Sequence, residues 1–209
     1  MKAQGLASDT ASCTVVPLAV DRATHRLARA AYLPSPNSDE RPDPSDLSLL
    51  VIHNISLPPD EFGGGPDGSP DKNYIDALFL NGLDPAAHPY FATIAELRVS
   101  AHLCIFRDGR ITQYVPFDRR AWHAGASRWQ GRERCNDFSI GIELEGSDTQ
   151  PFADAQYAEL IAATKALLAA YPRLSCSAIT GHSDIAAGRK TDPGPYFDWP
   201  RYRNALECR

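Results

Sequence analysis

Short apolar segments of strand length alternate along the chain with one long segment of helical periodicity. Residues 47–53 (LSLLVIH) and 138–145 (FSIGIELE) have the length and β-branched content of strands. Residues 154–171 repeat apolar side chains at helical spacing, with Asp154 as a candidate N-cap, and Pro172 ends the segment. This mixture predicts an α/β or α+β domain built on a mixed sheet.

The remaining elements are expected to complete this sheet and to cover it. Residues 100–106 and 111–115 are strand-like and flank Asp108-Gly109, a dipeptide typical of hairpin turns. Strand alternation over residues 138–145 places Ile140, Ile142 and Leu144 on one face, and Gly141, Glu143 and Glu145 on the other. We expect helices at residues 74–80, 91–97 and 201–207, and a short apolar run at 176–180.

The chain is long enough for one substantial core but gives no sign of a second one. It has 209 residues and no internal repeat. Residues 1–46 show weak periodicity and end in a turn-rich stretch at residues 33–46. We expect an N-terminal arm over residues 1–32 and a single domain over residues 33–209. Residues 58–70 are rich in Gly and Pro and predict a loop.

Charge and apolar patterning exclude several classes of partner. The balance of 21 Lys and Arg against 26 Asp and Glu gives a net charge of -5, which argues against a nucleic-acid-binding surface. No apolar run approaches the about 20 residues that cross a bilayer, and the N-terminus lacks the apolar core of a secretory signal. Five cysteines without repeated spacing predict reduced thiols. We therefore expect a cytoplasmic protein with neither a nucleic-acid nor a membrane partner.

Two histidines follow strand-like runs, where sheets place ligands. His53 comes after residues 47–52 and His182 after residues 176–181, and Asp192 lies in the constrained loop that follows. Imidazole nitrogens and a carboxylate oxygen suit Zn²⁺, and three such ligands leave a fourth position for water. For His53, a hydrogen-bonded structural role stays open as an alternative.

Two charged residues have both a catalytic and a structural interpretation. Glu143 in the middle of a strand is either a general base with a raised pKa or part of the solvated face of an edge strand. Lys190 is either a solvated loop lysine or, if Asp192 binds a metal, a charge near a developing oxyanion.

A mixed-charge loop lies beside several aromatic residues. Residues 132–137 (RERCND) are typical of a solvated surface, but the neighbouring Trp122, His123 and Trp129 also fit a wall that binds carbohydrate or peptide. A thiol nucleophile formed by Cys135 with His123 has no local sequence support.

Together these segments resemble a known enzyme family. The resemblance runs from about residue 33 to residue 203 and rests on LLVIHNISLPPDEFGG, HPYF, LRVSAH, RAWHAG, QGRERCNDFSIGIELEG, TGHSDIA and RKTDPGPYFDW. The chain is similar to the zinc-dependent N-acetylmuramoyl-L-alanine amidases, in particular the cytoplasmic AmpD type that acts on 1,6-anhydro-muropeptides. Their fold, shared with T7 lysozyme and the peptidoglycan recognition proteins, is a mixed sheet flanked by helices.

The resemblance implies a set of site residues and one Zn²⁺ per chain. The zinc ligands would be His53, His182 and Asp192, and the catalytic groups Glu143 and Lys190. Positions that contact the muropeptide would be Asn54, Arg98 and Arg134. Residues 1–32 have no counterpart in the family pattern, the loop at residues 65–74 is longer than usual, and Ser183 replaces the expected Cys or other small residue.

The implied reaction is hydrolysis of the amide between anhydro-N-acetylmuramic acid and the L-Ala of the stem peptide. In the family this serves cell-wall recycling, and its loss lets muropeptides that induce β-lactamase accumulate. We expect a monomer that prefers small soluble muropeptides. Two alternatives remain: a recognition module that has lost zinc, against which all five metal and catalytic residues argue, and an exported or phage-type wall lysin.

Overall fold

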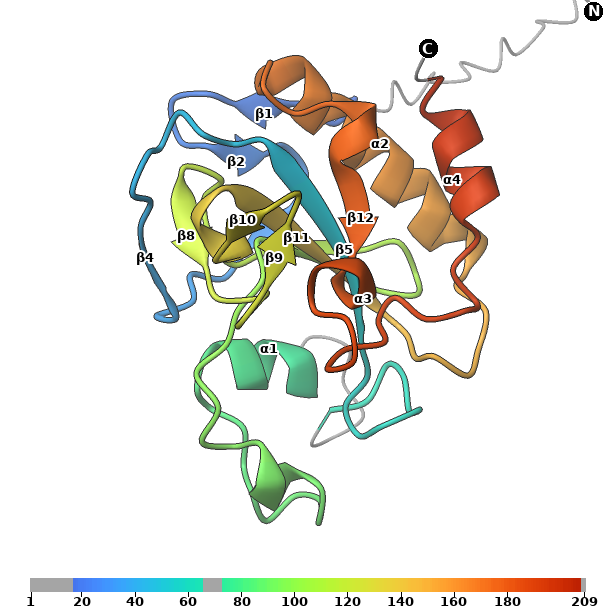
Figure 1. Ribbon diagram of the computed structural model, residues 1–209. Coiled ribbons are helices and arrows are strands. Elements are labelled where there is room, and N and C mark those ends of the chain that lie inside the picture. The colour runs from blue at the N-terminus through green and yellow to red at the C-terminus, as the bar shows by residue number, and fades with distance from the viewer. Residues whose placement is uncertain (1–16, 66–72, 208–209) are drawn as a thin grey trace, which may run out of the picture.

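A six-stranded mixed sheet forms the centre of the protein. The computed structural model describes residues 17–65 and 73–207, and its main sheet has the strand order β12-β5-β11-β6-β7-β3 (Figure 1). The first four strands are parallel, β7 is antiparallel to β6, and β3 is parallel to β7. Their bounds are β3 (Ala31–Tyr32), β5 (Leu49–Ile55), β6 (Leu103–Ile105), β7 (Ile111–Gln113), β11 (Ser139–Glu145) and β12 (Ile179–Gly181). The predicted mixed sheet and the hairpin at Asp108-Gly109 are thus confirmed.

Smaller elements surround this sheet. Three two-stranded ribbons pair β1 (Val20–Asp21) with β2 (Arg26–Leu27), β4 (Ser38–Glu40) with β8 (Arg119–Ala121), and β9 (Arg128–Trp129) with β10 (Arg132–Glu133). The α-helices are α1 (Tyr74–Phe79), α2 (Asp154–Ala170), α3 (His182–Ile185) and α4 (Trp199–Ala205). Single 3-10 turns are η1 (Phe91–Thr93), η2 (Cys135–Asp137) and η3 (Cys176–Ala178). Within the described ranges, no helix has both the length and the apolar character to cross a bilayer.

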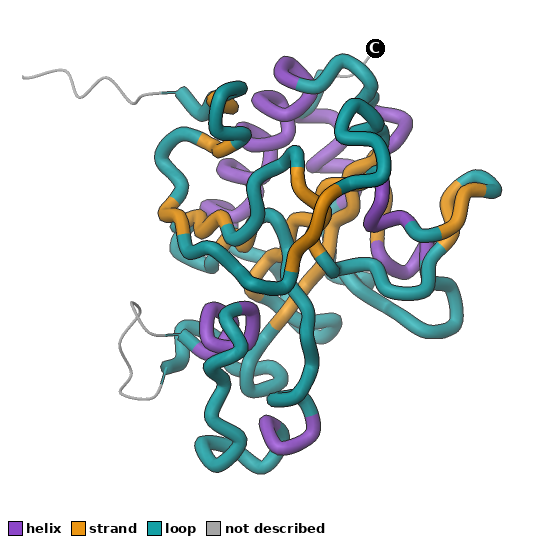
Figure 2. Tube along the Cα trace, turned by 90° about the vertical axis from the view of Figure 1, so that its left-hand side faces the viewer, coloured by secondary structure: helices purple, strands orange, loops and turns teal. Residues whose placement is uncertain are grey.

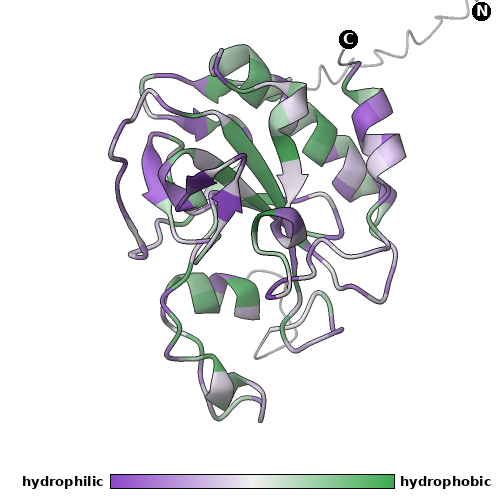
Figure 3. Ribbon diagram, in the orientation of Figure 1, coloured by the Kyte–Doolittle hydropathy of each residue, from purple (hydrophilic) through white to green (hydrophobic). Residues whose placement is uncertain are grey.

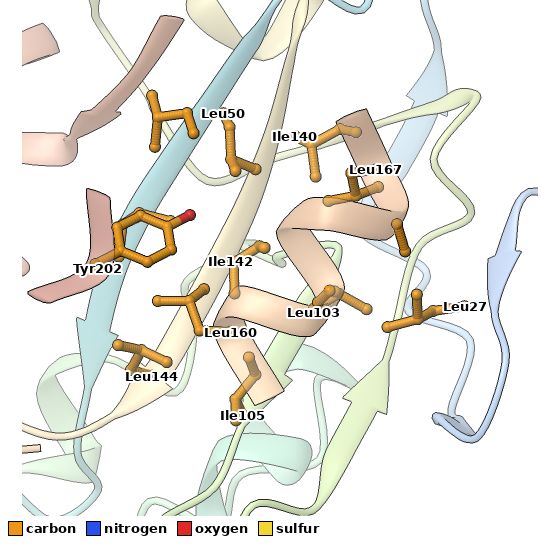
Figure 4. Close-up of a cluster of buried hydrophobic side chains, with 14 of the residues drawn as sticks. Leu27, Leu50, Leu103, Ile105, Ile140, Ile142, Leu144, Leu160, Leu167 and Tyr202 are labelled. Atoms are coloured by element: carbon orange, nitrogen blue, oxygen red, sulfur yellow. The ribbon is translucent and has the colours of Figure 1, made fainter. Parts of the chain in front are cut away.

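One face of the sheet is covered by α2 and α4. Alternate side chains of β5 and β11 point to this face because successive residues of a strand point to opposite sides. They pack against the helices in one apolar cluster, drawn in Figure 4, which includes Leu50, Ile140, Ile142, Leu144, Leu160, Leu167 and Tyr202. In Figure 3 the hydrophobic colour follows β5 through the middle of the molecule.

The other face carries α3 and two smaller clusters. Leu49 and Val51 pack with Phe138 and with Ile185 of α3. Beyond the end of the sheet where β5 finishes, α1 and η1 form a separate region of the fold (Figures 1 and 2). This region is joined to the sheet by a cluster that contains Leu57, Ile75, Leu78, Phe79, Phe91, Cys104 and Tyr114.

The described part of the N-terminal arm is attached to the rest of the protein. Leu27 lies in the large core cluster, and β3 forms the edge of the main sheet through its pairing with β7. Residues 1–16 of the arm and residues 66–72 of the loop expected to be long lie outside the described residues. The domain boundary at residue 33 stays a prediction.

Several local expectations need correction. The strand expected to stop at His53 continues to Ile55, because β5 pairs with β11 over seven residues. Residues 91–97 form only the turn η1, since so short a helix is marginal without packing along its length. The N-cap of α2 is Ala153, whose N–H donates to the Gln156 side chain, and not Asp154.

The edge-strand interpretation of Glu143 is also wrong. All seven residues of β11 are buried, because β5 and β6 lie on either side of it. Among the described cysteines, Cys104 and Cys135 are buried free thiols, but Cys176 is disulfide-bonded. The expectation of reduced thiols is wrong at Cys176, because the spacing of cysteines in a sequence does not show which of them are bonded.

Candidate active site

Three of the predicted site residues lie toward the carboxyl ends of three parallel strands. His53 in β5 lies directly beside Glu143 in β11, in register. His182 follows Gly181, the last residue of β12, and begins α3. Parallel strands bring their carboxyl ends to the same edge of a sheet, and this edge is where such folds place ligands.

A returning loop adds Asp192 to these residues. After α3 the chain turns back, and the Ser183 N–H donates to the carbonyl of Asp192 at 2.9 Å. The loop passes so close to β12 that a Cβ at Gly181 would lie 2.8 Å from Cδ of Pro193. The absence of a side chain at Gly181 therefore allows the loop to carry Asp192 to the two histidines.

Three ligand atoms converge in the resulting site. The Nδ1 atoms of His53 and His182 are 3.1 Å apart, and each is 3.0 Å from Oδ2 of Asp192. Ligands about 2.0–2.2 Å from a tetrahedral zinc are roughly 3.3–3.6 Å from one another, slightly more than these separations. The three residues form the candidate metal-binding group among the described residues, and their donor set fits Zn²⁺.

Burial and hydrogen bonding set the charge states that metal binding requires. Burial lowers the pKa of His53 to about 4, although the nearby Asp192 opposes this shift. Burial alone would raise the pKa of Asp192, but its hydrogen bonds with His182 and His53 outweigh burial and lower it. A neutral imidazole and an ionised carboxylate are the forms that bind metal.

Glu143 has the properties of a general base. Its carboxyl is buried, and its Oε2 atom has no hydrogen-bond partner among the described residues. Burial, and secondarily the charge of Asp192, raises the pKa of Glu143 well above its usual value. A buried carboxylate of raised pKa beside a metal-binding group is suited to accept and return a proton.

Asn54 and Lys190 lie on the same cleft. The amide of Asn54 donates to Oδ1 of Asp148 at 2.8 Å and to the carbonyl of Pro193 at 3.0 Å, which ties β5 to the loop that carries Asp192. Only the amide oxygen of Asn54 is left by these bonds for a substrate. Lys190 lines the cleft, and its charge partly offsets the raised pKa of Glu143.

The cleft has a polar floor and an apolar wall. Its volume is about 330 Å³. The polar lining includes the candidate metal-binding group, Glu143 and Lys190. The wall is contributed mainly by α1 and the segment around η1, with Leu78, Phe79, Tyr90, Ile94, Leu97 and Trp122. The cleft is therefore a boundary between the sheet and the region of α1.

Arg98 and Arg134 do not line this cleft. The Arg98 side chain is 47% exposed and pairs with Glu96 at 3.6 Å. Arg134 is 71% exposed, pairs with Asp137 at 3.2 Å, and lines a second groove of about 840 Å³ on the far side of α3. Their contact with a substrate stays a prediction.

The thiol interpretation of Cys135 finds no support in the structure. Its side chain is buried in the cluster with Leu49, Val51 and Ile185. Burial raises the pKa of the Cys135 thiol, whereas a nucleophilic cysteine needs a lowered pKa.

His123 also lines the cleft, although the sequence analysis does not place it beside His53. Its Nδ1 atom is 2.9 Å from Nε2 of His53. The other histidine of the candidate metal-binding group, His182, donates from Nε2 to the carbonyl of Ala124 at 3.1 Å. Adjacent residues after β8 thus contact the outer edges of both imidazoles, a long-range relation that no local spacing reveals.

Comparison with known proteins agrees with this arrangement. The sequence profile of the N-acetylmuramoyl-L-alanine amidases matches residues 43–195. The 1,6-anhydro-N-acetylmuramyl-L-alanine amidase AmpD of Citrobacter freundii is 63% identical over 177 residues, which cover 85% of this chain and 90% of that protein.

Solved structures show the same relation. A crystal structure of a selenomethionine AmpD derivative superposes with a TM-score of 0.81 at 61% identity, over 88% of this chain and 97% of that one. The Escherichia coli amidase AmiD, in complex with anhydro-N-acetylmuramic acid-L-Ala-D-γ-Glu-L-Lys, superposes with a TM-score of 0.55 at 29% identity, over 90% and 65% of the two chains. The chain belongs to the N-acetylmuramoyl-L-alanine amidase family, and it is an amidase of the AmpD type.

Proposed function

We propose that this enzyme uses zinc to hydrolyse the amide between 1,6-anhydro-N-acetylmuramic acid and L-Ala in muropeptides released during cell-wall recycling. The observation that carries the proposal is the convergence of three ligand atoms beside the unpartnered carboxyl oxygen of Glu143. The name of the Citrobacter relative and the ligand in the AmiD complex support the choice of substrate.

In this proposal one Zn²⁺ per chain is held by Nδ1 of His53, Nδ1 of His182 and a carboxylate oxygen of Asp192. When bound, zinc supplies a Lewis acid that polarises carbonyl groups and acidifies water. The sheet edge and the loop tied down by Asn54 hold the three residues in place before substrate arrives. Such preorganisation limits the entropy lost when the site is assembled.

Glu143 accepts a proton from the attacking water and delivers it to the departing amine. Its burial next to Asp192 makes the carboxylate a stronger base than an exposed glutamate. Lys190, on the cleft lining, stabilises the negative charge that develops on the carbonyl oxygen. The free amide oxygen of Asn54 accepts a hydrogen bond from the substrate.

The apolar wall receives the sugar. The bicyclic 1,6-anhydro ring is rigid, so little conformational entropy is lost when it is fixed against Tyr90 and Trp122. Arg98 and Arg134 pair with carboxylates of the stem peptide outside the cleft, as guanidinium groups do with carboxylates. We further propose that the enzyme is a cytoplasmic monomer and that its loss lets β-lactamase-inducing muropeptides accumulate.

Zinc analysis and product analysis on the purified protein test the proposal. We expect about one zinc per chain in the wild type, and loss of both metal and turnover in His182→Ala. His88→Ala, which removes a histidine outside the candidate metal-binding group, is the matched control for metal content and should keep its zinc. A His182→Ala protein with full zinc and full turnover would refute the ligand assignment.

Substrate choice is tested with matched anhydro and reducing-end muropeptides and with purified sacculi, with products separated by chromatography. The fastest release of stem peptide is expected from the anhydro compound. Equal rates on all three, or faster release from sacculi, would indicate a wall lysin. Cell fractionation and sedimentation test the compartment and the oligomeric state.

A further inference from the structure

The imidazole of His123 sits against the edge of His53 that faces away from the candidate metal-binding group. The two rings meet edge to face, with centroids 5.0 Å apart, and Nε2 of His53 is 2.9 Å from Nδ1 of His123. On its far side, Nε2 of His123 is 3.1 Å from Oγ of Ser139, at the start of β11. His123 therefore joins His53 to the neighbouring strand.

The hydrogen-bond directions follow from the role of His53. For Nδ1 of His53 to offer a lone pair to a metal, the ring hydrogen must be on Nε2. That N–H then donates to Nδ1 of His123, and the hydrogen of His123 is on its own Nε2, where it donates to Ser139. One tautomer of each ring satisfies the whole series, and in it His123 accepts the hydrogen of His53.

The ring of His123 packs closely against β11 at Gly141. A Cβ at Gly141 in β11 would lie 2.5 Å from Cγ of His123 and 2.6 Å from its Nδ1. Real Cβ atoms do not approach that closely, and Gly141 has no positive φ that would otherwise require glycine. The space left by the missing side chain at Gly141 is filled by His123.

A third histidine, His102, is hydrogen-bonded to the backbone of Gly141. The backbone N–H of Gly141 donates to the ring atom Nδ1 of His102 at 3.0 Å, and the backbone N–H of His102 donates to the carbonyl of Gly141 at 3.0 Å. The rings of His102 and His123 have centroids 5.8 Å apart. The backbone at Gly141, against which His123 packs, is thus held by two hydrogen bonds to His102, the residue before β6.

We propose that His123 is a positioning residue for the metal centre, and that Gly141 is the position that makes room for it. The inference rests on the proposed metal-binding role of His53. Partners that hold the outer nitrogen of a metal-binding histidine typically change metal affinity by about 10–100-fold when they are removed. We assign an effect of this size to the hydrogen bond between His53 and His123.

A matched pair of substitutions separates the hydrogen bond from packing. His123→Asn keeps an acceptor oxygen close to the place of Nδ1, whereas His123→Leu has nearly the same size as asparagine and no acceptor. We expect His123→Leu to weaken zinc binding about 10–100-fold in competition with a chelator, and His123→Asn to recover most of that loss. Equal zinc affinities for the two variants would overturn the proposal.

A double-mutant cycle tests the role of Gly141. Gly141→Ala should weaken zinc binding in the wild type by displacing His123, but should have little further effect in the His123→Leu protein, where the ring is gone. Additive losses would show that Gly141 acts independently of His123. Thermal unfolding of each metal-free variant identifies any loss that arises from misfolding. If Gly141→Ala alone does not fold, folding of the double variant with His123→Leu would support a clash between a Cβ at position 141 and the His123 ring, and failure of both to fold would count against it.

Two further measurements complete the test. In the zinc-loaded wild type, ¹⁵N NMR of the imidazoles should report hydrogen on Nε2 of His123, and hydrogen on Nδ1 would contradict the assignment. The control is His25→Asn. His25 has a positive φ, which asparagine tolerates, and its ring is hydrogen-bonded to Tyr171, so this substitution should leave zinc affinity unchanged. If the wild type binds no zinc, the proposed function fails. If the wild type binds zinc and the His123 variants bind it with the same affinity, the proposed function stands and this inference fails.

Discussion

The two faces of the central sheet are built from the same strands but have opposite properties. Toward α2, residues such as Leu50 and Ile142 form a continuous apolar surface. On the opposite face, the same strands carry the buried residues His53, Gly141 and Glu143 beside the apolar Leu49 and Val51, and His53 is hydrogen-bonded to His123. A shift of one residue in a strand separates core from active site, because the side chains of a strand alternate.

The two faces contribute differently to stability and to activity. The apolar face stabilises the fold by burial of aliphatic side chains, about 25 cal/mol per Å² of apolar surface. The polar face has buried ionisable groups whose pKa values are displaced, and burying them opposes folding. Substitutions on the polar face should therefore change activity more than stability, and those on the apolar face the reverse.

The largest effect is expected at Glu143. Glu143→Gln removes the proton acceptor without changing its size, so turnover should fall roughly 10²–10⁴-fold while bound zinc is retained. Steady-state kinetics and elemental analysis measure the two quantities. Loss of zinc in this variant would mean that Glu143 supports the metal centre, and the proposed division between ligands and base would be wrong.

The same variant should change the pH dependence of stability in the metal-free protein. The pKa of Glu143 is raised in the folded state, so the folded protein binds more protons than the unfolded one between the two pKa values. The unfolding free energy contributed by this group therefore falls as pH rises through that interval. Glu143→Gln should remove this fall in unfolding free energy. At pH values above neutral, the variant should therefore have a higher melting temperature than the wild type. A melting temperature below that of the wild type at every pH would contradict the prediction.

Lys190 should show a somewhat smaller effect of the same kind. Lys190→Ala removes a positive charge from the cleft lining, and turnover should drop roughly 10²–10³-fold with zinc retained. Lys165→Ala, on the exposed side of α2, is a control that should keep full turnover. A loss confined to KM would instead assign Lys190 to substrate binding.

A conservative change on the apolar face should act in the opposite way. Ile142→Val removes one methylene from the core beneath α2 and should lower the unfolding free energy by about 0.5–1.5 kcal/mol. Zinc affinity and turnover should stay at the wild-type level, although Ile142 adjoins Glu143 in the sequence. Chemical denaturation measures the first quantity. A parallel loss of zinc affinity would show that the two faces are coupled.

The contrast between the faces also explains what the sequence could reveal. Alternation in residues 138–145 is a local signal, and it correctly separated Ile142 from Glu143. The likeness to known amidases indicated His53, His182 and Asp192, which lie up to 139 residues apart and meet only through the sheet. The strand order itself has no local signature, so the sequence could not show that β11 lies between β5 and β6.

The role of His123 was hidden for a related reason. Its neighbours His53 and Ser139 are 70 and 16 residues away in sequence, and no periodicity connects them. Glycine at 141 was equally ambiguous, since it fits a strand pattern without showing which ring lies against it. Contacts of this kind depend on packing between elements, whereas sequence patterns report mostly on single elements.

The smallest effect is expected at Arg134, which lies outside both faces. Its side chain is 71% exposed, so a pairing with a stem-peptide carboxylate should contribute only about 0.2–1 kcal/mol. Arg134→Ala should accordingly raise KM by roughly 1.4- to 5-fold with kcat unchanged. The difference should shrink as salt screens the charges. A fall in kcat of tenfold or more would show that Arg134 reaches the reacting groups during turnover. In that case the groove beyond α3 and the catalytic cleft would act as one binding site, and the separation seen here would describe only the free enzyme.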